Sequence, residues 1–240
     1  MTGPSSFGTT HWGLVLAARD RVTPEARAAL GALCEVYWYP LYAFVRRKGH
    51  DSETSRDLVQ GFLASLLESG GLEKVGPERG RFRSFLMAAC SHYLSHQRER
   101  DRALKRGGGH SALSLDTLDA ERRYRLELAD DATPERLFLR RWATTLLDLV
   151  LDRLTREQTE AGKGATFEAL KPALLGDDAA SYRDLGARVG LNEGTARVAT
   201  HRLRARYRTL LREEIARTLA DPSEEAVAEE LNDLFAALAN

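Results

Sequence analysis

Cysteine is scarce in this sequence, with Cys34 and Cys90 as the only two among 240 residues. Both stand in apolar surroundings without the spacing of a disulfide framework, which predicts buried free thiols in a reducing compartment. Long apolar runs are also missing, since no stretch approaches the roughly 18 residues of a membrane span and no charged leader precedes an apolar stretch. These absences predict a soluble, cytoplasmic protein with no membrane partner.

Motifs that carry catalysis are missing as well. The sequence has no glycine-rich phosphate loop, no nucleophile elbow and no paired carboxylates in a supporting context, so we expect neither an enzyme nor a cofactor. His92 and His96 share one face of a predicted helix, but Cys90 lies far round that helix, and no metal site is expected. One hypothesis from the enzyme class stays open, namely a helical metal or nucleotide enzyme with a basic substrate cleft.

Alternating β-branched patterns are absent, and nearly every periodic segment has helical spacing, so the predicted fold is all-α. A helical domain over 24–106 follows an N-terminal extension at 1–23. A polar, acidic linker over 107–133, partly helical near 120–128, leads to a second helical domain over 134–219 and an acidic helical tail over 220–240. Helices are expected over 24–48, 52–69, 81–105, 134–154, 165–174, 182–189, 192–219 and 224–238.

Charge is segregated along the chain, although 35 basic and 35 acidic residues give a net charge of zero. Residues 79–106 hold eight arginines and lysines against two acids, and residues 197–217 hold seven arginines against two glutamates. Residues 220–240 carry six acids and no lysine or arginine. Two basic segments and an acidic end therefore coexist, which is typical of a protein with a polyanionic partner.

The strongest motif lies over 181–211, where a short amphipathic helix, a turn at Gly190 and a long arginine-rich helix predict a helix-turn-helix. Asn192 is placed to cap the second helix, and the small Gly186 stands in the first. Apolar residues recur along the second helix at steps of three and four, while arginines occupy its opposite face. That face is expected to meet DNA through Asn192, Thr195, Arg197, Val198, His201, Arg202 and Arg204. The alternative is a solvated arginine face on an ordinary helical hairpin.

Aromatic and basic residues interleave over 80–100, a combination that holds single-stranded nucleic acid. The expected contacts are Arg81, Phe82, Arg83, Phe85, His92, Tyr93, His96, Arg98 and Arg100. For Phe82 and Phe85 a place in the core is the alternative, because they share a helical stripe with Leu86. The preceding helix, over 52–69, turns Asp57, Gln60 and Gly61 outward on a face suited to a protein partner.

In their order and spacing, these motifs resemble bacterial RNA polymerase sigma factors of the extracytoplasmic-function (ECF) type, in the sigma-70 family. Residues 57–62 (DLVQGF) are similar to the domain-two helix that binds the clamp coiled coil of the polymerase, residues 80–100 to the segment that melts and reads the minus-ten element, and residues 181–208 to the fourth domain, which reads the minus-thirty-five element. Residues 9–12 and 37–42 resemble a subgroup with extended ends.

The resemblance implies two helical DNA-binding domains, sigma domain two and the domain-four helix-turn-helix, on a flexible acidic linker. It implies promoter DNA and core RNA polymerase, through the clamp helices of its largest subunit and its flap, as partners, with Asp57, Leu58, Gln60 and Gly61 as polymerase contacts. Departures from the family pattern are Gly61 for an acid, Phe85 for Trp, His92 for Asn and Ala196 for Val.

A stand-alone helix-turn-helix regulator, with the N-terminal helices as a sensing or dimerisation module, is the alternative function. The sequence leaves open whether an anti-sigma factor, a regulatory kinase or the acidic tail controls activity. The tail could cover the basic second helix, dock a regulator or simply pack on the second domain.

Overall fold

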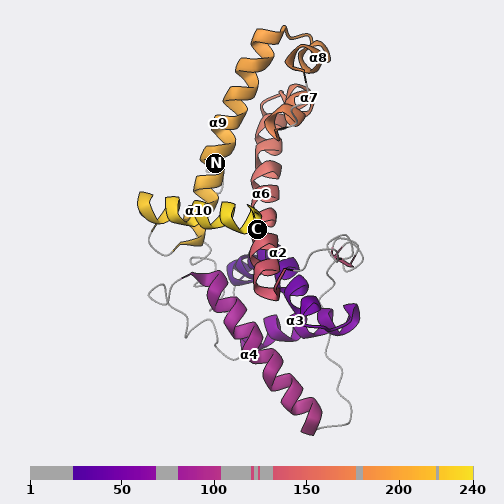
Figure 1. The fold of residues 1–240 in the computed structure, drawn as a ribbon. Helices are drawn as coiled ribbons and strands as arrows, with labels where there is room; N and C mark the ends of the chain where they lie inside the picture. The colour runs from indigo at the N-terminus through magenta and orange to yellow at the C-terminus, as the bar shows by residue number, and fades with distance from the viewer. Residues whose placement is uncertain are drawn as a thin grey trace. The chain divides into compact units, whose positions relative to one another are not determined.

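A computed structural model describes residues 24–68, 81–103, 120–121, 124, 132–176, 181–219 and 222–239. These residues form α helices and no strand, which confirms the all-α prediction (Figure 1). The motif at 9–12 and most of the predicted linker lie outside them. The helices are α2 (Pro24–Arg47), α3 (Ser52–Glu68), α4 (Phe82–Ala103), α6 (Pro134–Glu160), α7 (Gly164–Leu174), α8 (Tyr182–Ala187), α9 (Glu193–Thr218) and α10 (Glu224–Ala239).

Most helix ends lie within two residues of the predicted ends, and α6 is the exception. Apolar periodicity stops at Leu154, where the prediction ended the helix, but α6 continues to Glu160. The extra turns consist mainly of arginine, glutamate and glutamine, which are good helix formers, and Arg153 pairs with Glu157 one turn on at 3.6 Å. Helix propensity therefore carries α6 past its buried stripe.

Contacts divide the chain into two compact units, one of Met1–Thr144 with Ile215–Asn240 and the other of Thr145–Glu214. The divisions fall inside α6 and α9. The first unit thus joins α2, α3 and α4 to the start of α6, the last residues of α9 and the acidic helix α10. The second consists of the remainder of α6 and α9 with α7 and α8.

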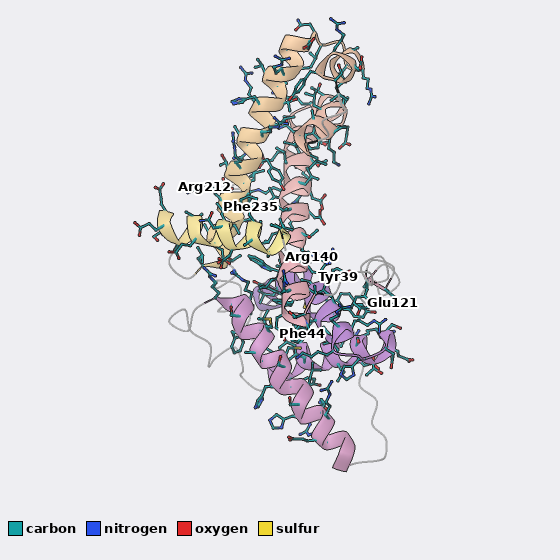
Figure 2. All side chains as sticks on the ribbon, in the orientation of Figure 1. Tyr39, Phe44, Glu121, Arg140, Arg212 and Phe235 are labelled. Carbon is teal, nitrogen blue, oxygen red and sulfur yellow. The ribbon has the colours of Figure 1, made fainter. Side chains whose placement is uncertain are left out.

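The first unit is built on aromatic packing. The rings of Tyr37 and Phe82 are T-shaped with 5.4 Å between centroids. Phe44, labelled in Figure 2, is fully buried, and its ring lies 6.2 Å from that of Phe138 of α6. Arg47 Nε also donates to the carbonyl of Ala132 at 2.9 Å. Aromatic faces and hydrogen bonds together hold the start of α6 against α2.

A short segment of the predicted linker packs on α2. Glu121 accepts hydrogen bonds from the Tyr42 hydroxyl at 2.6 Å and from Arg46 Nε and Nη2 at 3.1 Å each. The Arg46 guanidinium lies 4.6 Å above the ring of Tyr124, which is buried, as is Ala120. The described part of 107–133 is therefore anchored, with helical residues at 120, 121 and 124.

In the second unit, α6 and α9 run beside one another, with α7 and α8 at one end (Figure 1). Arg206 of α9 donates to both carboxylate oxygens of Glu157 in α6, at 2.8 and 2.7 Å, and Arg153 pairs with Glu213 at 2.7 Å. The Tyr207 hydroxyl donates to the carbonyl of Leu147 at 3.2 Å. The buried apolar residues of the second unit are Leu146, Val150, Leu154, Phe167, Leu170, Ala173, Leu185, Ala196, Leu203, Leu210 and Leu211.

Candidate DNA-binding surfaces

The turn between α8 and α9 has the hydrogen bonds of a Schellman motif. The Leu191 amide donates to the carbonyl of Gly186 at 2.9 Å, and the Gly190 amide to that of Ala187 at 3.4 Å. Gly190 has φ +70°, a left-handed conformation that disfavours residues with a Cβ. The chain then enters α9 through Asn192, whose Oδ1 accepts a 2.8 Å hydrogen bond from the Thr195 amide. The predicted N-cap is thus confirmed.

Close packing fixes α8 against α9. A Cβ on Gly186 would lie 2.7 Å from the carbonyl oxygen of Leu191 and 3.1 Å from the Cβ of Ala196. Both Gly186 and Ala196 are buried, and Gly186 leaves no room for a larger side chain. Two small residues therefore let the short helix approach the long one closely.

The opposite face of α9 is open to solvent. Arg197, His201, Arg202 and the neighbouring Thr195 are exposed, and Val198 is 53% exposed, unusual for a large apolar residue. Arg197 is held by Glu193 at 2.9 Å and lies 5.5 Å from the Tyr182 ring centroid. The face thus combines guanidinium donors with an apolar side chain, which suits base edges and the thymine methyl group.

Two arginines that the helical pattern placed on this face have internal partners. Arg204 donates to the carbonyl of Ala173, near the end of α7, at 2.5 Å, and Arg206 is held by Glu157. Arg204 is an expected DNA contact; it is exposed, and its guanidinium also bonds the end of a neighbouring helix. Arg208, one turn further along, is exposed. Two of these arginines therefore also hold α9 against its neighbours within the same unit.

The aromatic residues of α4 divide between core and surface. Phe82 is 2% exposed, which fits the core alternative, and Phe85 is half-buried with its ring 6.1 Å from that of Phe82. Tyr93 is also half-buried, beside Phe62 of α3 at 5.8 Å. Partial burial raises the pKa of the Tyr93 hydroxyl above its usual value. Phe85 and Tyr93 are thus the rings within reach of a ligand.

Further along α4, the polar candidates lie in solvent. His92, His96, Arg98 and Arg100 are exposed, and the two imidazole rings are 4.4 Å apart. Arg98 Nη2 lies 3.3 Å from His50 Nε2. Among the described residues, no group of three or more histidine, cysteine or acidic side chains could hold a metal ion.

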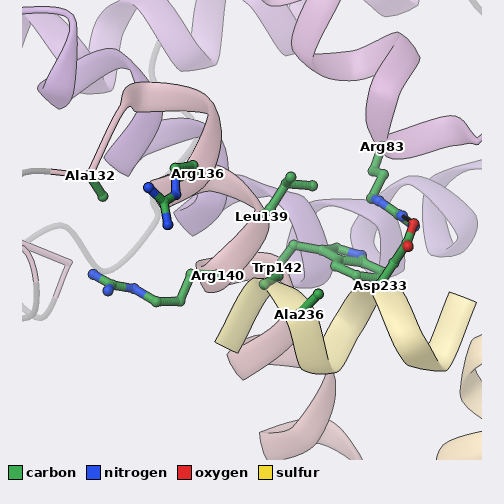
Figure 3. Close-up of a pocket in the computed structure, with 9 residues that line it drawn as sticks. Arg83, Ala132, Arg136, Leu139, Arg140, Trp142, Asp233 and Ala236 are labelled. Carbon is green, nitrogen blue, oxygen red and sulfur yellow. Dashed lines mark hydrogen bonds and ion pairs between the residues drawn. The ribbon is translucent and has the colours of Figure 1, made fainter. Parts of the chain in front are cut away.

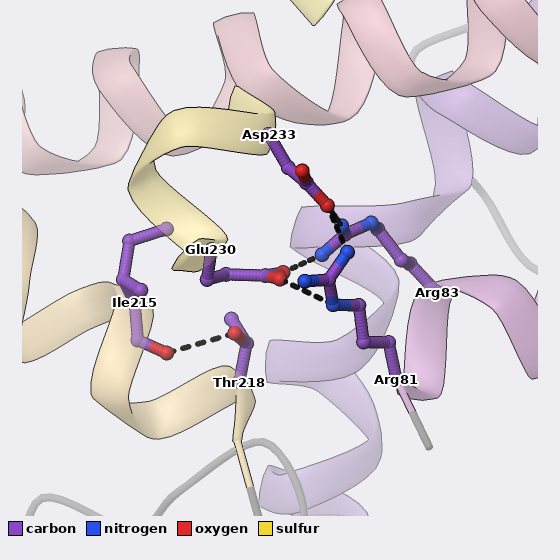
Figure 4. A network of polar contacts seen from close by, with 6 residues as sticks. All are labelled: Arg81, Arg83, Ile215, Thr218, Glu230 and Asp233. Carbon is purple, nitrogen blue, oxygen red and sulfur yellow. Dashed lines mark hydrogen bonds and ion pairs between the residues drawn. The ribbon is translucent and has the colours of Figure 1, made fainter. Parts of the chain in front are cut away.

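Arg81 and Arg83, at the start of α4, have carboxylate partners on α10 (Figure 4). Arg83 pairs with Glu230 and lies 3.1 Å from Asp233, while Arg81 pairs with Asp233. Arg81 Nε also lies 2.8 Å from Glu230 Oε2, an ion pair without the alignment of a hydrogen bond. The tail's described ion pairs thus run to α4, an arrangement the sequence interpretation did not include.

The network is partly buried. The side chains of Arg83 and Glu230 are 6% and 1% exposed, and the guanidinium of Arg83 lies 4.3 Å from the ring centroid of Trp142. Burial, and then the charge of Arg81, lower the pKa of Arg83 to about 10, so this side chain is still cationic at neutral pH. Removing one partner of a buried ion pair costs about 3–5 kcal/mol, because the other charge is left without compensation.

A cavity of about 310 Å³ adjoins this network, between the start of α6 and α10 (Figure 3). The residues lining it are Arg83, Ala132, Arg136, Leu139, Arg140, Trp142, Asp233, Ala236 and Ala237. The small side chains that α10 presents here leave the space between the two helices unfilled.

The predicted polymerase face of α3 is partly exposed. Asp57 is exposed and lies 3.3 Å from Arg56 Nε, while Leu58 and Gln60 are half-buried. Gly61 lies under Tyr93 of α4, because a Cβ there would be 2.5 Å from the tyrosine hydroxyl. The buried residues of α3 are Ser55, Val59, Phe62 and Leu63.

Both cysteines are free, as predicted. Cys90 is buried, and desolvation raises the pKa of its thiol to about 12. Cys34 is half-buried, and desolvation raises the pKa of its thiol as well. No helix among the described residues is long and apolar enough to cross a membrane. Comparison of the chain with protein-family models, curated proteins and solved structures gave no match.

Proposed function

We propose that this protein is an RNA polymerase sigma factor of the extracytoplasmic-function type, which binds core polymerase and directs it to promoters with minus-ten and minus-thirty-five elements. The observation that carries the proposal is the α8–turn–α9 unit. Its Gly190 turn, its Asn192 cap and the close approach at Gly186 set an exposed, arginine-bearing helix at the edge of its unit. Such a helix fits the major groove.

Within that groove, different side chains have different tasks. Arg197 and Arg202 are suited to bidentate bonds with guanine, each worth about 1–3 kcal/mol of discrimination against other bases. Val198 suits the methyl group of thymine. Arg204 contributes positive potential while it holds the end of α7, since its guanidinium is already bonded to the carbonyl of Ala173. Specificity therefore depends on fewer residues than affinity does.

The α4 segment is the proposed surface for the parted strand. Phe85 and Tyr93 provide half-exposed rings on which bases can stack, and the exposed Arg98 and Arg100 lie along the same helix. Opening ten base-pair steps costs roughly 14 kcal/mol at about 1.4 kcal/mol per step. Two or three stacked bases return only about 2–9 kcal/mol. Core polymerase must therefore supply the remaining contacts.

Core binding is assigned to the exposed face of α3, where Asp57 has its carboxylate in solvent. The substitution D57A should weaken co-elution with bacterial core polymerase. The matched control is E53A, because Glu53 is an exposed acid of the same helix that also lies near Arg56, at 4.0 Å. Each variant removes one carboxylate from the neighbourhood of that arginine, so a specific effect of D57A is not a general charge effect.

The same experiment separates the sigma factor from a stand-alone regulator. A regulator binds its DNA site without polymerase, and neither D57A nor E53A should alter its activity. A sigma factor loses transcription with D57A in proportion to its loss of core binding and keeps both with E53A. Equal behaviour of the two variants, together with tight DNA binding by the chain alone, would favour the regulator.

A further inference from the structure

We infer that α10 is an internal competitor for the DNA strand, with Glu230 and Asp233 occupying the guanidinium groups of Arg81 and Arg83 that would otherwise hold backbone phosphates. The inference rests on the proposed function, because it concerns regulation of the proposed strand-binding segment. It starts from the four contacts that join these two arginines to the two acids (Figure 4).

The first step is the chemistry of the pair. Arg81 and Arg83 are two residues apart at the start of α4, and each is shared between both acids. Carboxylates and phosphates compete for the same forked guanidinium donors. While α10 is in place, these donors face protein carboxylates, and Arg83 is almost fully buried. Arg83 is then closed to a nucleic-acid backbone, and Arg81, whose side chain is 35% exposed, is occupied by the two carboxylates.

The second step is that α10 is suited to leave as a unit. Its helix is formed locally, since the Ser223 hydroxyl oxygen accepts a 3.2 Å hydrogen bond from the Ala226 amide, and Glu224 and Glu225 occupy its first turn. The cavity beside Asp233 means that α10 meets α6 with incomplete packing there (Figure 3). Its buried apolar anchors are Val227 and Leu234.

The third step is charge. Residues 220–240 carry six acids and no basic residue, so α10 and a nucleic-acid strand are both polyanions that repel one another at the start of α4. Binding of one therefore opposes binding of the other. The acidic helix would reduce binding of the DNA strand by the free chain. In the polymerase complex the DNA makes more contacts, and these would favour displacement of α10.

The experiment compares two double variants that each remove two charges from α10. E230Q/D233N breaks the network, whereas E225Q/E229Q neutralises two exposed acids of the same helix. Binding of a labelled 20-nucleotide single-stranded DNA of mixed sequence is measured by fluorescence anisotropy over a salt series. Helix content and thermal unfolding are recorded for each protein by circular dichroism.

E230Q/D233N should bind the strand about tenfold more tightly than the unmodified chain, which corresponds to about 1.4 kcal/mol. Its plot of log affinity against log salt should be steeper by about 1.4, because two further phosphates are neutralised at about 0.7 each. E225Q/E229Q should leave the slope unchanged. Adding R81Q/R83Q to E230Q/D233N should abolish the gain, since the freed arginines would be gone.

Should the double variant lose helix content, D233N alone keeps the test decisive, because the Asp233 side chain is 47% exposed and tolerates substitution. It should give a smaller gain in the same direction. Equal affinities and slopes for all variants that still join core polymerase would overturn the inference alone. Failure of the unmodified chain to join core polymerase would overturn the proposed function, and the inference with it.

Discussion

Substituting alanine for Gly186 should weaken the helix-turn-helix, although the same change in an ordinary helix is stabilising. Alanine favours a helix over glycine by about 0.8–1.0 kcal/mol in the interior, and by less in the last turn, where Gly186 lies. Against this gain, the new Cβ would lie 2.7 Å from the carbonyl oxygen of Leu191. That oxygen belongs to the backbone of the turn and has little freedom to move.

Overpacking of this kind costs about 1–3 kcal/mol, so the G186A variant should lose about 1 kcal/mol of stability on balance. The control is G31A in α2, where nothing lies within 4 Å of the added Cβ. G31A should raise the free energy of unfolding by about 0.8–1.0 kcal/mol. The same chemical change should therefore have opposite signs at the two positions.

Urea titration followed by circular dichroism gives the two free energies, and amide hydrogen exchange locates the effect. The Leu191 amide, which donates to the carbonyl of Gly186, should exchange faster in G186A and unchanged in G31A. DNA affinity should fall only in G186A, because α9 is displaced. If G186A stabilises the protein as G31A does, and the Leu191 amide keeps its protection from hydrogen exchange, then α8 and α9 do not approach as closely as described.

Three further predictions concern single groups. The hydrogen bonds from Arg206 lower the pKa of Glu157 below its ordinary value of 4.5. The ionised Glu157 therefore stabilises the fold above pH 4.5, and this stabilisation is lost as the pH falls through the lower pKa of the folded state. E157Q should flatten the acid limb of a stability–pH curve. N192A should lower the free energy of unfolding by about 1 kcal/mol in urea titration, since the cap of α9 is lost. A thiol reagent at pH 8 should modify Cys34 before Cys90, because burial raises the pKa of Cys90 to about 12; equal rates would contradict its burial.

Local patterns predicted the helices well, because each amphipathic repeat and each cap acts over a few residues. The turn at Gly190 and the cap at Asn192 are of this kind, and both have the predicted geometry. The partner of a long side chain is harder to predict, since it depends on the neighbouring helix. Arg204 and Arg206 stand on a polar stripe in the sequence, yet α7 and α6 supply their partners.

The surface that binds the acidic tail could not be predicted from the sequence. Six acids predict attraction to a basic surface, and the basic surface considered from the sequence was the arginine-rich second helix of the motif. The choice of α4 follows from tertiary placement, which sets Glu230 and Asp233 beside Arg81 and Arg83.

The most direct measurement is to mix the purified chain with bacterial core polymerase and genomic DNA and to sequence the starts of the transcripts formed. We expect discrete starts that share two upstream motifs, and we expect these starts to be lost when Arg197 and Arg202 are both changed to alanine. Transcripts no different from those of core polymerase alone, with the chain folded and present in excess, would contradict the proposed function.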